Sequence, residues 1–231
     1  MTPPRVDLTL PADDRALAAS LATTWRDLLY RPGPGLTSPL DPGAYRSSLV
    51  VIRGDGVAIR VTSRVSPAFG ADLSRLALEI IAPGRVDRLG ETLGSFFDPA
   101  RTGTVYVLTP DRGAGAARPP ERAEWRYDGP SLAGRLQRIA RVRVLREHGR
   151  GAEAGWSADR GLVLTTADGA ECLMLAVSEP AEVALFLPAP GLYRALLDGA
   201  AAPQPGVTVR DLLGHGDRDD DVDVTVTLHP L

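Results

Sequence analysis

The sequence predicts an α+β fold of two similar halves, each ordered as helix, antiparallel strands, helix and strands, and related by a pseudo-two-fold axis. Two observations support this prediction. Each half contains an Asp-Gly hairpin turn, at residues 54–56 and 167–169, and a third strand-like run follows each hairpin. Both third runs end in Ala-Pro-Gly, at residues 82–84 and 189–191, and a helical pattern follows both. An internal duplication explains this shared order.

The composition is typical of a globular protein with a sizeable core. The chain has 231 residues, of which 44% are apolar and 24% are charged. We expect the halves to span residues 1–129 and 130–231 and to form one compact domain. The net charge of −3 argues against nucleic acid as a partner, because no overall positive charge attracts phosphate.

The residue usage also indicates the source and the compartment. All 26 basic residues are arginine, which a GC-rich genome explains, so we expect a high-GC bacterium. Cys172 is the single cysteine, which excludes a disulfide within the chain. The chain has no apolar run of membrane-spanning length and no signal-peptide pattern at its start, so we expect a cytoplasmic protein without membrane contact.

The first half opens with a helical pattern from Pro11 to Leu28, followed by a proline- and glycine-rich loop. Its apolar residues recur on one helix face; they are Leu17, Leu21, Trp25 and Leu28. Residues 45–65 predict the first hairpin. The other predicted elements of this half are a third strand, a short helix and two strands, over residues 75–81, 85–97, 104–109 and 123–128.

The second half begins with a segment that allows two interpretations. A helix capped by Ser131 ends near Ala140 and a strand starts at Arg141, or one helix continues through both. Residues 160–177 predict the second hairpin. The remaining predicted elements are a third strand, a helix, a strand or strand-to-helix junction, and an alternating final strand, over residues 181–188, 192–201, 206–213 and 221–228.

No pattern indicates catalysis, a metal or a cofactor, so we predict no catalytic, cofactor-binding or metal-binding residue. The chain lacks the G-x-S-x-G elbow of serine hydrolases, and its three histidines and one cysteine lack the spacing of a zinc site. An enzyme whose site the sequence does not reveal remains an alternative. That site would lie around His148, His215 or Cys172.

The densest basic stretch runs from Arg135 to Arg146. We interpret its arginines as the solvated face of a helix or a strand. The competing hypothesis is a sliding-clamp-like DNA-binding module, in which these arginines would supply the positive charge on an inner helix.

Two stretches resemble one protein family. They are RGDGVAIRV in the first half, and GWSADRGLVLTTADGAECLMLAV followed by VALFLPAPGLYRALL in the second. Each has the order hairpin, strand and helix, and together they resemble the EspG-type chaperones of type VII (ESX) secretion systems. The resemblance implies a pseudo-two-fold α+β fold that has no catalytic site and binds secreted substrate proteins in the cytosol.

We therefore expect a non-enzymatic protein-binding module, a cytosolic secretion chaperone or adaptor that forms a hetero- or homo-oligomer. The candidate partner surface is the loop over residues 66–72, in which Pro67 and Phe69 are apolar residues in an otherwise polar turn. The alternative is that Phe69 folds back into the core.

Overall fold

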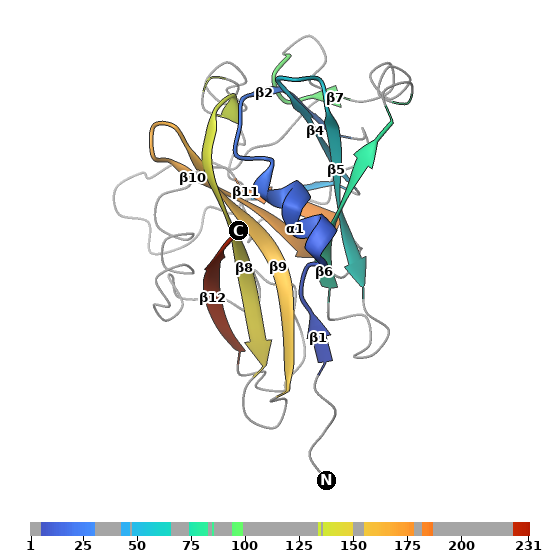
Figure 1. Ribbon diagram of the computed structural model, residues 1–231, viewed down its shortest axis with the longest axis vertical. Helices are drawn as coiled ribbons and strands as arrows, with labels where there is room; N and C mark the ends of the chain where they lie inside the picture. The colour runs from blue at the N-terminus through green and yellow to red at the C-terminus, as the bar shows by residue number, and fades with distance from the viewer. Residues whose placement is uncertain are drawn as a thin grey trace, which may run out of the picture.

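The computed structural model shows a mixed α+β fold dominated by strands (Figure 1). The described strands form two sheets, and the helix α1 (Ala12–Ala19) lies against both. No helix in the described part of the chain is long and apolar enough to cross a membrane. The structure describes residues 6–30, 43–46, 48–65, 74–82, 85, 94–98, 134, 136–149, 155–177, 182–186 and 224–231.

The five-stranded sheet is antiparallel, in the order β6-β5-β4-β2-β7. The strands are β2 (Trp25–Tyr30), β4 (Leu49–Arg53), β5 (Ala58–Val65), β6 (Ser74–Ile81) and β7 (Gly94–Ser95). The turn between β4 and β5 contains Asp55 and Gly56, and Gly56 has a φ of +85°, a conformation that favours glycine. The predicted first hairpin is therefore confirmed at this turn.

The seven-stranded sheet has the order β12-β8-β9-β10-β11-β3, and β1 joins it beside β9. β9 has two neighbours along the same side: β10 pairs with Gly161–Thr165, and β1 pairs in parallel with Trp156–Ala158. The strands are β1 (Val6–Leu8), β3 (Gly43–Arg46), β8 (Ile139–Gly149), β9 (Trp156–Thr166), β10 (Glu171–Val177), β11 (Glu182–Phe186) and β12 (Val224–Pro230). The β9–β10 turn confirms the predicted second hairpin.

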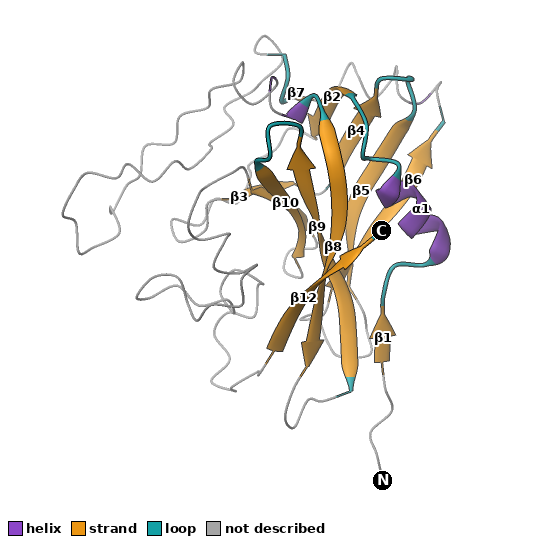
Figure 2. Cartoon of the chain, turned by 60° about the vertical axis from the view of Figure 1, so that its left-hand side comes forward, coloured by secondary structure: helices purple, strands orange, loops and turns teal. Residues whose placement is uncertain are grey.

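The two sheets face each other, and a hydrophobic core fills the space between them (Figure 2). β5 and β6 supply the core from one side, and β8 to β11 supply it from the other. The core side chains of these strands include Ile59, Val61, Leu76, Leu78, Val142, Val144, Leu162, Leu164, Met174 and Leu185. Removing such side chains from water is the main term that stabilises the fold.

The helix α1 connects the two sheets at one side, since it contacts β6 of one sheet and β8 of the other. Pro11 precedes its first turn, where Asp13 and Asp14 lie next to the positive end of the helix dipole. Asp14 also pairs with Arg75 on β6 at 3.5 Å, and Ala18 is buried in the core. α1 therefore fixes the position of β6 next to the seven-stranded sheet.

The predicted N-terminal helix is correct only as far as Ala19. Trp25 and Leu28 lie on β2, which pairs antiparallel with β4. The register of that pairing shifts between Trp25 and Asp27, so Trp25, Leu28 and Tyr30 all reach the core although Trp25 and Leu28 are three residues apart. A β-bulge thus produces a helix-like spacing within a strand.

Three other boundaries differ from the prediction. Gly94 and Ser95 form β7 beside β2, so they are not part of the predicted helix over residues 85–97. β8 starts at Ile139, one residue before the expected helix end, which excludes a continuous helix through Arg141. Tyr45 belongs to β3, which pairs with β11 in the seven-stranded sheet rather than with the first hairpin.

The third strand of each half is confirmed, as β6 and as β11, and so is the final strand, as β12. Four predicted elements lie outside the described residues, over residues 104–109, 123–128, 192–201 and 206–213.

Candidate functional site

Of the residues singled out from the sequence, the structure describes Cys172 and His148. Pro67, Phe69 and His215 lie outside the described residues. Cys172 is buried in the core between the sheets. The strand register places Cys172 level with Leu164 and Val142, and His148 lies six residues further along β8, about 20 Å away at 3.3 Å per residue. Cys172 and His148 therefore do not form a catalytic pair.

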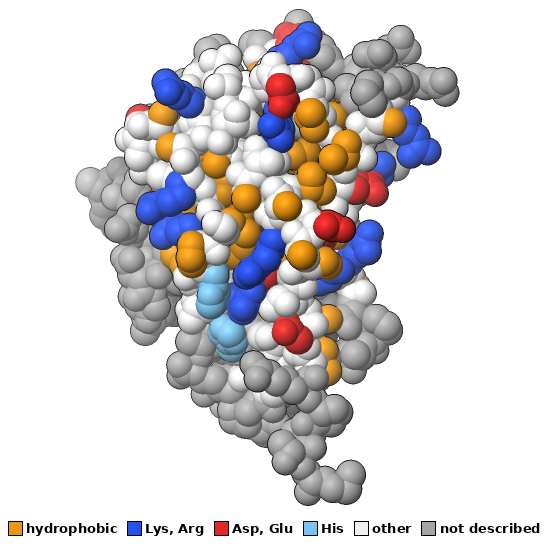
Figure 3. Space-filling model, in the orientation of Figure 1, with side chains coloured by type: hydrophobic (Ala, Val, Ile, Leu, Met, Phe, Trp, Pro, Cys, Tyr) orange, Lys and Arg blue, Asp and Glu red, His pale blue; other side chains and the backbone are white. Residues whose placement is uncertain are grey.

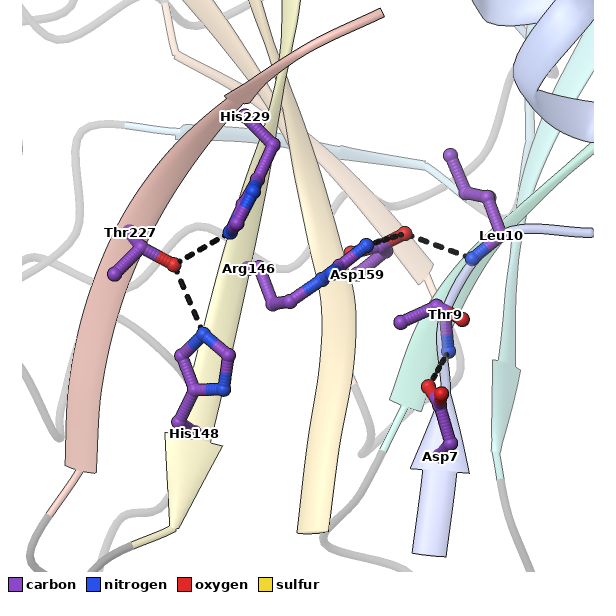
Figure 4. Close-up of polar contacts among 8 residues, drawn as sticks. All are labelled: Asp7, Thr9, Leu10, Arg146, His148, Asp159, Thr227 and His229. Carbon is purple, nitrogen blue, oxygen red and sulfur yellow. Dashed lines mark hydrogen bonds and ion pairs between the residues drawn. The ribbon is translucent and has the colours of Figure 1, made fainter.

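The structure does bring two histidines together, on β8 and β12. The Thr227 hydroxyl lies 2.9 Å from Nε2 of His148 and 2.8 Å from Nε2 of His229 (Figure 4). The imidazole rings cross edge to face, with centroids 6.3 Å apart. Because a hydroxyl has one proton, it donates to one imidazole and accepts from the other when both are neutral. This arrangement links the side chains of the two strands.

An ion pair lies beside the histidines in the same face of the sheet. Thr227 is opposite Arg146 on β8, and Arg146 is opposite Asp159 on β9. Arg146 donates from Nε and Nη2 to the two carboxylate oxygens of Asp159, at 2.6 and 3.1 Å. Asp159 is fully buried and also accepts the backbone N–H of Leu10 at 2.8 Å. The carboxylate thus joins β8 and β9 to the segment that leads into α1.

The electrostatic environment of His229 favours its neutral form. Partial burial lowers the pKa of His229 below its ordinary 6.5, and the positive charges of Arg146 and Arg15 act in the same direction. The Asp159 carboxylate opposes them. The pKa of Arg146 itself is raised, mainly by its hydrogen bond to Asp159. The positive potential of the arginines therefore extends to the imidazole on β12.

A second ion pair anchors the strands from within the protein. Glu147 and Arg160 are both fully buried, and Nε of Arg160 lies 3.2 Å from the carboxylate. Arg160 also donates from Nη1 to the carbonyl and hydroxyl oxygens of Ser74 on β6, at 3.0 and 2.6 Å. Burial lowers the pKa of Arg160, and the charge of Glu147 opposes that shift. This network links β8 and β9 to β6 of the other sheet.

The cluster of His148, Thr227, His229, Arg146 and Asp159 is called the polar cluster below. Its histidines lie beside arginine side chains on the surface below α1 (Figure 3). Among the described residues, no three His, Cys, Asp or Glu side chains are grouped as a metal site requires. The polar cluster therefore offers hydrogen bonds and charge at the surface next to β12, and two imidazoles beside a hydroxyl.

β12 itself is an edge strand of the seven-stranded sheet. Within the described part of the chain it pairs on one side only, with β8. Val226 and Leu228 lie opposite Glu147 and Leu145, whereas Thr227 lies opposite Arg146. The other side of the strand leaves a row of backbone N–H and C=O groups without ladder partners among those residues.

The alternation of residues 221–228 predicted a strand, but nothing local to the sequence joins it to His148. The contact between Thr227 and His148 spans 79 positions, and it depends on the pairing of β12 with β8. The strand-like alternation from Arg141 was the available signal that His148 lies on a strand.

Comparisons with known proteins return no relative: no family model, curated protein or solved structure matches this chain. The function must therefore be inferred from the polar cluster and from β12.

Proposed function

We propose that this chain is a non-enzymatic protein-binding module, a cytosolic secretion chaperone or adaptor of the kind that the resemblance to EspG-type chaperones implies. The observation that supports it best is the edge of β12, which pairs with β8 alone within the described part of the chain. That strand has seven residues, and none is a carboxylate, an arginine or a lysine. Long uncharged edges promote pairing with another chain, so proteins usually protect them.

The other described edges carry such protection. On β6, Arg75 pairs with Asp14 at 3.5 Å, and Glu79 pairs with Arg60 at 2.9 Å, so charges line that edge strand. β7 and β3 are short, with two and four residues. β12 has only a terminal proline, Pro230, at its last position. The contrast supports β12 as an edge that a partner covers.

The basic stretch gives less support to DNA binding than the sequence suggested. Among the described residues of this stretch, Arg141, Arg143 and Arg146 lie on β8 instead of an inner helix. Arg143 pairs with Glu171 and Arg146 pairs with Asp159, so carboxylates compensate two of the positive charges. We therefore prefer protein to DNA as the partner.

A second candidate function is hydrolysis with Thr227 as nucleophile, favoured by the imidazoles on both sides of its hydroxyl. Its test is the hydrolysis of a small activated ester by the protein and by its Thr227→Val variant. Turnover that disappears in the variant would support catalysis, and equal rates would exclude it.

We also propose that the two halves arose by duplication. β4-β5-β6 and β9-β10-β11 are both antiparallel hairpins followed by a third strand, and both hairpins turn at Asp-Gly. Sequences of homologues test the proposal: their averaged first and second halves should align better with each other than with shuffled sequences, and no excess similarity would refute it.

Protein binding is tested by co-expressing the chain with the products of its neighbouring genes. Size-exclusion chromatography with light scattering should show a stoichiometric complex whose mass exceeds that of the chain alone. A strictly monomeric chain that retains none of these proteins would contradict the proposal.

A further inference from the structure

We propose that His148, Thr227 and His229 form a binding site for a divalent transition-metal ion with tetragonal coordination, Cu²⁺ or Ni²⁺, and that the ion joins β12 to β8. The site goes beyond the proposed protein-binding function and does not depend on it. It departs from the expectation of no metal-binding residue. That expectation rested on spacing along the sequence, whereas the two histidines lie on different strands.

The two imidazoles converge on one point from opposite directions along the strands. Arg146 and Thr227 are partners across β8 and β12, whereas His148 is opposite Thr225 and His229 is opposite Val144. The histidines therefore lie on either side of the Arg146–Thr227 pair. Both Nε2 atoms nevertheless approach the Thr227 hydroxyl, at 2.9 Å and 2.8 Å (Figure 4). Two nitrogens and one oxygen thus share one location.

The spacing of these atoms fits coordination around a single ion. With metal–ligand bonds of about 2.0–2.1 Å, two ligand atoms at right angles are about 2.9 Å apart. The two oxygen–nitrogen distances, 2.8 and 2.9 Å, agree with that value. Two imidazoles on opposite sides of one ion place their ring centroids about 6.4 Å apart. The observed separation is 6.3 Å, so the imidazoles fit trans positions with the hydroxyl between them.

This geometry selects the class of metal. A square-planar or tetragonal set of nitrogen and oxygen ligands is typical of Cu²⁺ and Ni²⁺, whereas zinc sites are mostly tetrahedral. Cu²⁺ should bind more tightly than Ni²⁺, following the general order of affinities. Mg²⁺ and Ca²⁺ prefer oxygen ligands, so a pair of imidazoles selects against them. The described residues supply two nitrogens and one oxygen, and water completes the coordination.

The existing hydrogen bonds already direct a lone pair to this location. The Thr227 hydroxyl has one proton and donates to one Nε2 at a time, and a nitrogen that accepts this proton is itself unprotonated. That nitrogen binds a metal directly, and the other imidazole does so as its Nδ1–H tautomer. All three side chains are half-buried, so an ion from solvent reaches them.

The charges around the site leave room for a cation. Arg146 lies beside it, but the two carboxylate oxygens of Asp159 accept its hydrogen bonds and compensate its charge. Arg15 on α1 adds a positive charge that acts on His229, and Asp159 again opposes it. Salt screens such interactions at a half-exposed site. The charges therefore weaken metal binding without replacing the two imidazole ligands.

Calorimetric titration with Ni²⁺ tests the site, using the full chain without a histidine tag and with excess Mg²⁺ to occupy carboxylate sites. At about pH 7.5 imidazole is neutral. His148→Gln and His229→Gln should each weaken binding at least about tenfold, because each removes a ligand. His215→Gln is the matched control, since it removes the third histidine of the chain and should leave the affinity unchanged. Equal losses in all three variants, or none in the first two, would indicate an adventitious ion only and overturn the site.

Two measurements on the unmodified protein keep the proposal testable if a variant fails to fold. Electron paramagnetic resonance of the Cu²⁺ complex should show an axial signal split by two imidazole nitrogens, and a signal without nitrogen splitting would refute the assignment. Ni²⁺ should also raise the thermal midpoint and slow hydrogen exchange of the β12 amides, because the ion binds the folded chain and holds β12 to β8. Stabilisation without protection of β12 would place the ion elsewhere.

Discussion

Arg146 lies directly opposite Asp159, and its guanidinium donates two hydrogen bonds to that buried carboxylate. The register of β8 against β9 shifts immediately before this pair, between Leu145 and Arg146, so that Arg160 is the additional residue of β9. The bulge lies between the part of β9 that pairs with β10 and the part that pairs with β1. The same local irregularity thus orients Arg146 and Arg160 toward their acidic partners.

Replacing Asp159 with asparagine should destabilise the protein by about 1.5–3 kcal/mol, the range for hydrogen bonds to charged groups. The variant leaves Arg146 without its carboxylate and weakens the acceptor of the Leu10 N–H. Urea unfolding monitored by circular dichroism measures the change. Asp55→Asn is the control, because the Asp55–Arg53 pair is exposed and should contribute less than about 1 kcal/mol. Equal effects of the two variants would contradict the structural role of Asp159.

The buried pair of Glu147 and Arg160 should show strong coupling. Glu147→Gln should cost about 3–5 kcal/mol, because it leaves a buried guanidinium without its counter-charge. The double variant Glu147→Leu with Arg160→Met should cost less than Glu147→Gln alone, because it removes both charges of this buried pair. A double-mutant cycle by urea unfolding measures the coupling, and additive losses would show that the two residues act independently.

The pH dependence of stability should follow His229. Its pKa in the folded protein lies below 6.5, so the unfolded chain takes up the proton first as the pH falls. The contribution of His229 is therefore fully present above pH 6.5 and declines as the pH falls through the lowered folded value. Urea midpoints measured across this range should decrease less steeply in His229→Gln than in the unmodified protein. His148 and Asp159 remain in that variant, so an unchanged slope would assign the dependence to groups other than His229.

The elements that local chemistry specifies were predictable, and those that depend on distant pairing were not. Asp-Gly at residues 55–56 and 168–169 specifies both hairpins, because glycine permits the positive φ that the turns require. The helix–strand error at Trp25 and Leu28 arose because a bulge changes the two-residue period of β2.

The polar cluster was less predictable for a different reason. His229 is two residues from Thr227 on β12, whereas His148 is 79 residues away in the sequence, and the pairing of β12 with β8 brings it to Thr227. No spacing within the sequence records that pairing, so the sequence alone does not place the two histidines together. The alternating pattern of β12 was visible, but its neighbour in the sheet was not.

Gly161 on β9 tests how closely the strands of the seven-stranded sheet are packed. A Cβ atom on Gly161 would lie 2.8 Å from the carbonyl oxygen of Met174 and 3.0 Å from Cδ1 of Leu173. Gly161→Ala should therefore destabilise the protein by about 1–3 kcal/mol, because the backbone of β10 must move. Gly134→Ala is the matched control, because a Cβ there meets no atom within 4 Å and the residue is helical. The control should stabilise the protein by about 0.4–1 kcal/mol, since alanine restricts the unfolded chain. Thermal and urea unfolding of both variants should give changes of opposite sign, and a neutral Gly161→Ala would show that β9 and β10 lie further apart than this structure places them.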